Sequence, residues 1–358
     1  MKELRKKLRQ SKFMSRMYYG LHIDNIVFSN GWFGFDNSIN SAMRKYLSEK
    51  EMADSKYVKQ IRKDIIKCYR KYKSLPSEYF LFNFRNLPES KRATYVTDTY
   101  INSTLAQIVG RKSHDEQLND KWNFYCLMKP YFKRKVIKVS NKTDYESFKK
   151  FALDVKHIIA KPNDESVGSG IRVFHMNTEN DAKDVFNEIK KTTKEYVLEE
   201  LIIQSKDMAR WNESSVNTVR VSAFLNKKGF FILSSIIRTG RKGSVIDNAG
   251  HGGISAAINP KTGVIISDGM DKMGLWHKEH PDTGASFSGY QIPHWSELVA
   301  LAEEIHRTIP NQIYVGWDFA LTDNGWVLIE GNWGQLGAQQ VALGYGLKPL
   351  FNKYLYAN

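Results

Sequence analysis

The sequence predicts an α+β protein with a mainly helical region at residues 1–118, followed by mixed helices and antiparallel hairpins. Residues 40–73 place apolar side chains every three or four positions, which indicates one face of an amphipathic helix. Residues 315–334 instead hold two apolar runs joined by Asp323-Asn324-Gly325, a signal typical of a β-hairpin. The expected helical face carries Tyr57, Ile61, Ile65, Cys68 and Tyr72.

Length and composition predict a globular protein that stays in the cytoplasm. The 358 residues are 42% hydrophobic, which suffices for one large core or for two or three domains. No apolar run approaches the roughly 18 residues of a membrane helix. No apolar segment of a secretory signal follows the basic N-terminus. The only cysteines, Cys68 and Cys126, fit neither a disulfide framework nor zinc spacing, which indicates a reducing compartment.

Positive charge is concentrated near the N-terminus. Residues 1–73 hold 18 Lys or Arg against 7 Asp or Glu, a net +11 of the chain's formal +15. This predicts contact with an anion, such as an anionic membrane at its inner face, a lipid-linked glycan or a charged polymer. A well-solvated helical face explains the same charge equally well. Nucleic acid is the least favoured partner because no recognition motif accompanies the charge.

The hairpin at residues 315–334 is expected to gather oxygen donors. A three-residue loop with Gly325 in the left-handed region would pair Thr322 with Trp326, Ala320 with Leu328, Asp318 with Glu330, and Gly316 with Asn332. Side chains alternate along strands, so Asp318, Glu330 and Asn332 share one face. The apolar face would carry Trp317, Phe319, Leu321, Val327 and Ile329. Two carboxylates and an amide oxygen suit Mg²⁺; the alternative is a simply solvated face.

A small-residue loop follows the strand that ends at Lys161. Residues 163–170 (NDESVGSG) join this strand to another at residues 171–175. Glycines allow backbone N–H groups to approach phosphate oxygens closely, although such a hairpin tip is more often just a turn. The segment is not a Walker loop, and no dinucleotide-binding GxGxxG motif is present.

Three further segments carry polar residues where apolar ones are expected. Glu199 and Glu200 interrupt an apolar strand, which either solvent exposure or hydrogen bonding to adenine and ribose would explain. Arg220 and Arg238 lie at the ends of apolar strands, where phosphate or carboxylate binding competes with a structural salt bridge. Residues 245–255 combine glycines with Asp, Asn and His, which favours a ligand-binding loop over an Asx turn and bulge.

Taken in order, these segments resemble the ATP-grasp superfamily over about residues 119–350. The resemblance rests on Asp120-Lys121, Lys161 with the loop Ser166–Gly170, Glu199–Ile202, Asp318, and Glu330-Gly331-Asn332. The segments Ser215–Arg220, Asp247-Asn248 with Gly252-Gly253, and His280–Thr283 are similar to the branch called sugar-transfer-associated ATP-grasp proteins. The first 118 residues are not covered and do not look like the α/β domain that begins many superfamily members.

The resemblance implies a fold in which two α+β lobes with antiparallel sheets clamp ATP. Residues 119–207 would form the small lobe, with the phosphate loop. Residues 208–358 would form the large lobe, with the metal and acceptor site. The cofactors implied are ATP and Mg²⁺.

The resemblance also assigns a role to each matching residue. Phosphates and adenosine would contact Lys121, Lys161, Ser166, Gly168, Ser169, Gly170, Glu199, Glu200, Leu201, Ile202 and Asp207, the last through ribose. The metal would be held by Asp318, Glu330 and Asn332. Arg220 would stabilise the transferred phosphoryl group, and Asp247 or His251 would accept a proton from an amine. Substrate would contact Asn217, Arg238, Asn248, Gly252, Gly253 and His280.

Three functions are compatible with such a site. The favoured one is a ligase that joins a carboxylate to an amine through an acyl phosphate, with a uronic acid or amino acid as substrate in surface-glycan biosynthesis. The second is a phosphotransferase that acts on a hydroxyl group. The third is a non-catalytic, nucleotide-responsive binding protein.

Overall fold

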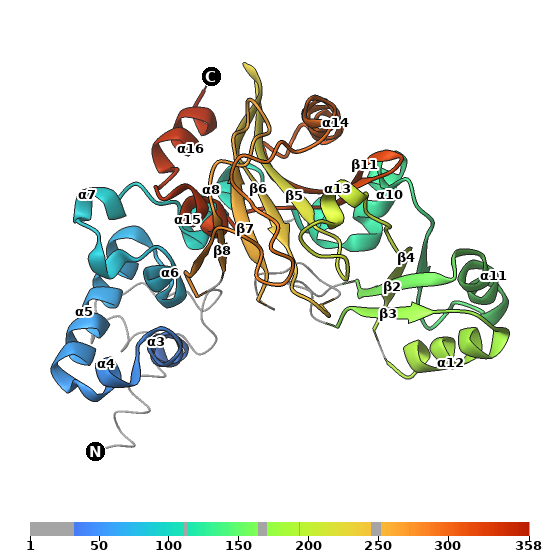
Figure 1. The fold of residues 1–358 in the computed structure, drawn as a ribbon, viewed down its shortest axis with the longest axis horizontal. Helices are drawn as coiled ribbons and strands as arrows, with labels where there is room; N and C mark the ends of the chain where they lie inside the picture. The colour runs from blue at the N-terminus through green and yellow to red at the C-terminus, as the bar shows by residue number, and fades with distance from the viewer. Residues whose placement is uncertain are drawn as a thin grey trace. The chain divides into compact units, whose positions relative to one another are not determined.

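The computed structural model describes residues 32–110, 114–163, 170–192, 194–244, 252–271 and 273–357. The chain forms two compact units, Met1–Thr104 with Leu336–Phe351, and Leu105–Gln335 with Asn352–Asn358 (Figure 1). The expected N-terminal region ran to residue 118, whereas the first compact unit ends at Thr104 and includes a segment near the C-terminus.

The first unit is helical, as predicted. Asp54 caps α5 (Ser55–Tyr72) by accepting from the backbone N–H groups of Lys56 and Tyr57. The helix buries Ile61, Ile65, Cys68, Tyr69 and Tyr72. These side chains join one core with aromatic residues of α3 and α6, so the predicted amphipathic face is confirmed. The other helices that contribute to this unit are α3 (Trp32–Tyr46), α4 (Glu49–Ala53), α6 (Pro76–Leu81), η1 (Phe84–Asn86), α7 (Glu89–Arg92), α8 (Asp98–Ile108), α15 (Gly337–Leu343) and α16 (Lys348–Leu355).

The second unit contains a small antiparallel sheet in the order β1-β4-β2-β3. The strands are β1 (Val136–Val139), β2 (His157–Pro162), β3 (Arg172–His175) and β4 (Tyr196–Glu200). Helices α11 (Tyr145–Val155) and α12 (Glu179–Lys190) pack on the face that carries Ile158, Ala160 and Leu198 (Figure 1). Side chains alternate, so Lys161 and Glu199 lie on the opposite face.

The same unit contains a seven-stranded antiparallel sheet in the order β11-β10-β5-β6-β7-β8-β9. Its strands are β5 (Thr218–Asn226), β6 (Gly229–Thr239), β7 (Ile254–Ile258), β8 (Gly269–Asp271), β9 (Trp276–His277), β10 (Tyr314–Thr322) and β11 (Gly325–Asn332). The remaining helical elements are η2 (Asp115–Asn119), α10 (Lys121–Phe132), α13 (Lys206–Ala209) and α14 (Trp295–Thr308). Within the described residues, no helix combines the length and apolar character needed to cross a membrane.

The hairpin β10–β11 differs from its predicted register near the turn. Gly325 has the expected positive φ of 92°, but Thr322 pairs with Gly325 and Ala320 with Val327, so the predicted pairs Thr322–Trp326 and Ala320–Leu328 are wrong. A β-bulge between Leu328 and Glu330 absorbs one extra residue and restores the pairs Asp318–Glu330 and Gly316–Asn332. The predicted apolar face is therefore wrong between the bulge and the turn, where Leu328 rather than Ile329 pairs with Phe319 and Trp326 rather than Val327 pairs with Leu321.

Candidate active site

Two arginines converge on Asp318, one from the adjacent strand β5 and one from β6, the next strand in the sheet. Arg220, the cross-strand partner of Asp318, donates from Nε and Nη2 to its two carboxylate oxygens at 2.6 Å each. Arg238 on β6 donates from Nη1 to Oδ2 at 2.9 Å. Burial alone would raise the pKa of Asp318, but the two guanidinium charges outweigh it and lower that pKa. Of the two roles expected for these arginines, ligand binding or a structural salt bridge, the structure shows the salt bridge, with Asp318 as the partner.

Glu330 and Asn332 complete a group of oxygen donors at this end of the sheet. The Asn332 amide donates to Glu330 Oε1 at 2.9 Å, and Arg220 Nη2 lies 3.7 Å from the same oxygen. Desolvation and the charge of Asp318 raise the pKa of Glu330, whose side chain remains 47% exposed. A Cβ on the intervening Gly331 would lie 2.9 Å from the Trp317 ring, which explains the glycine in this Glu-Gly-Asn sequence.

This donor set fits a divalent cation. Hard oxygen ligands from two carboxylates and an amide suit Mg²⁺, and a cation would relieve the repulsion that raises the Glu330 pKa. The Asp318 carboxylate would bind the cation through an oxygen lone pair that does not accept from Arg220 or Arg238. Among the described residues, no group of three or more His, Cys, Asp or Glu side chains is placed to hold a metal; the candidate set consists of two carboxylates and the Asn332 amide.

A second charged cluster lies on the small sheet. Lys161 Nζ contacts Glu199 Oε1 at 2.6 Å, and Arg134 donates from Nε at 2.8 Å and Nη2 at 2.5 Å to Glu199 Oε2. Burial alone would raise the pKa of Glu199, but these two cations lower it to about 2. Arg134 Nη1 also donates to the Leu328 carbonyl at 2.7 Å, which ties this cluster to β11, two residues before Glu330.

Replacing Glu199 by glutamine is expected to lower the free energy of unfolding by about 3 kcal/mol at pH 7, because two nearly buried cations lose their counter-charge. The folded-state pKa is about 2, below the ordinary value of 4.5. The contribution of the carboxylate is therefore complete above about pH 4.5 and is lost as the pH falls toward 2.

Urea unfolding of the wild type and of Glu199→Gln between pH 7 and pH 3 checks this expectation. The difference between them should narrow as the pH falls. The matched control is Glu200→Gln, because Glu200 is more exposed and accepts from the Lys135 backbone N–H at 3.1 Å. A pH-independent difference for Glu199→Gln would contradict the ion-pair explanation.

Asn163 brings Lys121 to the end of the strand that carries Lys161. Asp120 caps α10, and the Asn163 side chain donates to Asp120 at 2.8 Å and accepts from the Trp122 backbone at 2.9 Å. Lys121 Nζ lies 3.4 Å from the Asn163 carbonyl oxygen. The structure thus gathers both predicted phosphate-binding lysines near the start of the small-residue loop.

Backbone groups at the end of β4, where adenine was predicted to bind, already form hydrogen bonds within the protein. The backbone N–H of Glu200 donates to the Lys135 carbonyl and that of Leu201 to the His157 carbonyl, each at 2.9 Å. Both oxygens of Glu199 are also engaged. A purine at this strand end would therefore need donors or acceptors further along the chain, including Ile202. Asp207 lies in α13 and accepts from the Tyr290 hydroxyl through its carbonyl oxygen at 3.3 Å.

Two predicted substrate residues are buried and form protein contacts. Asn217 has no exposed surface, and its amide donates to the carbonyls of Met208 at 2.7 Å and Asn212 at 2.8 Å. His280 Nε2 lies 2.9 Å from the Gly240 carbonyl oxygen, and His280 Nδ1 accepts from the Asp282 backbone at 3.3 Å. Burial lowers the pKa of His280, which favours neutral imidazole. Both contacts position neighbouring chain segments.

Several predicted site residues lie outside the described residues, namely Ser166, Gly168, Ser169, Asp247, Asn248 and His251. At the borders of these segments, Gly170 and Gly252 have φ values of 69° and 87°, a backbone region that favours glycine. Gly253, beside Gly252, is buried and leads into β7.

Arg134 was not predicted from the sequence. It stands in the run Lys133-Arg134-Lys135, which looks like a solvated basic turn. Its side chain is instead 5% exposed, and its guanidinium carbon lies 4.2 Å from the Phe132 ring centroid. The only sequence signal was indirect, because a buried glutamate such as Glu199 needs a cationic partner.

Two antiparallel sheets of four and seven strands, with a lysine–glutamate pair on the smaller and a carboxylate–arginine cluster on the larger, agree with the fold that the ATP-grasp resemblance implies. The family model for sugar-transfer associated ATP-grasp proteins matches residues 100–354, so the chain belongs to this family. The predicted resemblance and fold class are confirmed.

Solved structures with similar folds share little sequence with this chain. D-alanyl-alanine synthetase A from Vibrio cholerae O1 biovar eltor str. N16961 is 11% identical, with 69% of this chain and 67% of that chain covered and a TM-score of 0.43. The ATP-grasp ligase PsnB is 12% identical, with 69% and 62% covered and a TM-score of 0.42. D-alanine–D-alanine ligase from Bacillus anthracis is 12% identical, with 72% and 74% covered and a TM-score of 0.39. No curated protein sequence matches the chain.

Proposed function

We propose that this protein is an ATP-dependent ligase that joins a carboxylate to an amine through an acyl phosphate, with a uronic acid or amino acid as the carboxylate substrate in surface-glycan biosynthesis. The observation that carries the proposal is the cluster in which Arg220 and Arg238 both bind Asp318 beside Glu330 and Asn332. The cluster supports the proposal because its arginines would bind phosphate and carboxylate groups and its oxygen donors would suit Mg²⁺.

The reaction follows from what such a site does chemically. A carboxylate is a poor electrophile at neutral pH, so its oxygen first attacks the γ-phosphorus of ATP, and ADP leaves. The amine nitrogen then attacks the acyl carbon, inorganic phosphate leaves, and the amine loses a proton. The products are an amide, ADP and phosphate. Asp247 or His251 is the proposed acceptor of that proton.

In this proposal, three groups of residues have separate roles. Arg220 and Arg238 would orient the substrate carboxylate and balance the charge that develops on the transferred phosphoryl group. Lys161 and Lys121 would bind the phosphates of ATP. Asp318, Glu330 and Asn332 would hold Mg²⁺, which neutralises phosphate charge when bound.

Lys161 must exchange one anion for another in this proposal. It contacts Glu199 at 2.6 Å. Arg134 donates twice to the other oxygen of Glu199, so the carboxylate keeps a counter-charge when Lys161 turns to a phosphate. We therefore propose Arg134 as a positioning residue for this exchange.

Trapping the intermediate tests the proposal. The protein is incubated with ATP, Mg²⁺, hydroxylamine and a panel of uronic and amino acids. We expect hydroxamate to form together with ADP, because hydroxylamine intercepts an acyl phosphate. ADP with a stable phosphoester would instead identify a phosphotransferase. If neither product forms with any acid of the panel, the result would favour a non-catalytic binding protein.

A further inference from the structure

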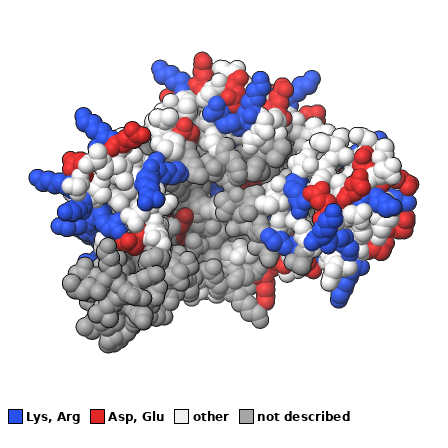
Figure 2. Space-filling view, turned by 90° about the horizontal axis from the view of Figure 1, so that it is seen from below, with Lys and Arg blue, Asp and Glu red and all other residues white. Residues whose placement is uncertain are grey.

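A basic groove lies in the helical unit, between α5 and the segment that contains η1 and α7. Its volume is about 760 Å³, and six of its twelve lining residues are Lys or Arg, whereas Asp64 is the only acidic one. The basic residues are Lys56, Lys59, Lys63, Lys67, Arg85 and Arg92. Several Lys and Arg side chains are exposed on this unit, at the left of Figure 2. We call this feature the basic groove.

The acidic residue does not neutralise the groove. Asp64 accepts from Arg92 Nη1 at 2.9 Å and from the Tyr79 hydroxyl at 2.8 Å. Lys67 pairs with Glu89. Among the residues that the structure describes, no carboxylate forms an ion pair with Lys56, Lys59 or Lys63. The groove therefore keeps an excess of positive charge that an anionic ligand would balance.

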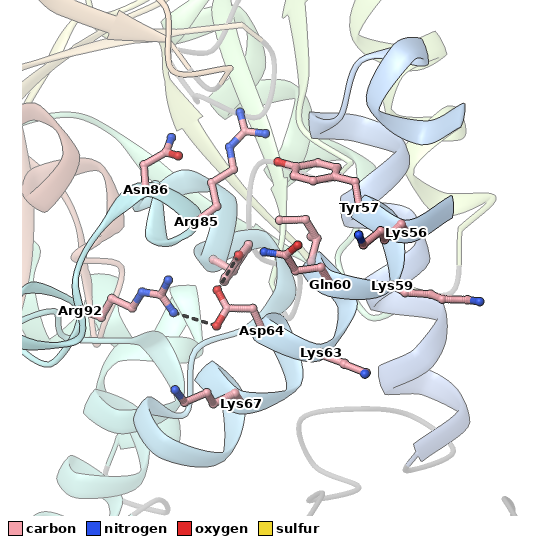
Figure 3. Close-up of a pocket in the computed structure, with 12 residues that line it drawn as sticks. Lys56, Tyr57, Lys59, Gln60, Lys63, Asp64, Lys67, Arg85, Asn86 and Arg92 are labelled. Carbon is pink, nitrogen blue, oxygen red and sulfur yellow. Dashed lines mark hydrogen bonds and ion pairs between the residues drawn. The ribbon is translucent and has the colours of Figure 1, made fainter. Parts of the chain in front are cut away.

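Arg92 makes one wall of the groove rigid. It donates from Nε to the Leu87 carbonyl at 2.8 Å and from Nη1 to Cys68 Sγ at 3.3 Å, in addition to Asp64. Its side chain is 11% exposed. Figure 3 shows Arg92 directed toward Asp64, whereas Lys59 and Lys63 extend away from it. The groove thus combines a fixed wall with long lysine side chains that are able to fold over a ligand.

Polar and aromatic groups line the groove beside the cations. Tyr57, Gln60 and Asn86 offer a hydroxyl and two amides, which suit the hydroxyl groups of a ligand. Arg85 pairs with Glu51 at 3.0 Å and remains 29% exposed, so its fork is accessible to phosphate oxygens. The volume lies within the range of about 300–1,000 Å³ that is typical of ligand pockets.

We propose that the basic groove binds a terminal phosphate or diphosphate group, carried either by a soluble molecule or by a lipid headgroup. Arg85 and the lysines of α5 contact the phosphate oxygens, and Gln60 and Asn86 contact the rest of the ligand. Helical charge alone would be explained by solvation. Arg85 and Arg92 come from a segment other than α5 and form a second wall, so the charged face of α5 becomes one side of a pocket. This site is separate from the proposed ATP site and does not depend on it.

The experiment compares two double variants of the full chain. Lys59→Gln/Arg85→Gln removes one Lys and one Arg from the groove. Arg44→Gln/Lys50→Gln removes the same charges from exposed positions of the same unit that do not line it. Inorganic pyrophosphate binding is measured by calorimetric titration without divalent cations. Sedimentation with vesicles compares phosphatidylcholine containing phosphatidic acid with phosphatidylcholine alone. Thermal unfolding checks that both variants fold.

We expect the groove variant to bind at least one probe about tenfold more weakly than the wild type, with the control variant unchanged. Loss limited to pyrophosphate identifies a soluble ligand, and loss of vesicle binding identifies a lipid headgroup. Equal loss in both variants, or no binding of either probe by the wild type, would overturn the proposal. ADP release by the groove variant should match the wild type; a parallel loss would overturn the separation of the two sites.

Discussion

Replacing Glu330 by glutamine is expected to lower ADP release by about a thousandfold while the protein remains folded. A glutamine keeps the shape of the side chain but offers no negative charge to Mg²⁺, whose electrostatic contribution is several kcal/mol. Stability should not fall, because desolvation and the charge of Asp318 already raise the pKa of Glu330. Removing that charge relieves repulsion.

The measurement is ADP release at saturating ATP and Mg²⁺, with the acid that gives the hydroxamate product. Glu213→Gln serves as the matched control, since Glu213 is exposed and lies outside the cluster. Thermal unfolding of both variants separates catalysis from folding. If the Glu330→Gln variant releases ADP at the wild-type rate, Glu330 is not a ligand of the metal.

Replacing Asp318 by asparagine is expected to have two effects. ADP release should be lost, and the free energy of unfolding should fall by about 3–5 kcal/mol, because breaking a buried ion pair leaves uncompensated charge. The carboxylate pairs with Arg220 and Arg238, whose side chains are 7% and 15% exposed. The sequence alone indicated only a metal ligand, which would predict loss of activity with an unchanged fold.

Urea unfolding measures the second effect. Asp323→Asn is the matched control, because Asp323 lies in the exposed turn of the same hairpin. We expect its unfolding free energy and its activity to equal those of the wild type. An Asp318→Asn protein as stable as this control would contradict a structural role for the ion pairs.

The local patterns predicted a helical face within residues 40–73 and a hairpin at residues 315–334, but not that residues 40–73 divide among α3, α4 and α5. In α5, the spacing of apolar residues matches the buried face, because a helix that packs on one side needs such spacing. In the hairpin, the pairs Asp318–Glu330 and Gly316–Asn332 were correct although the pairs nearer the turn were not. A bulge shifts register locally and leaves no clear signal in a single sequence.

Side chains alternate along paired strands, so the local pattern was enough to place Asp318, Glu330 and Asn332 together at the candidate site. The partners of these residues depend on the order of the strands in the sheet. Arg220 and Arg238 reach Asp318 because β5 lies between β10 and β6 in the sheet, an order that no local pattern specifies. Burial of the Asp318 carboxylate demands cations, and strands distant in the chain supply them.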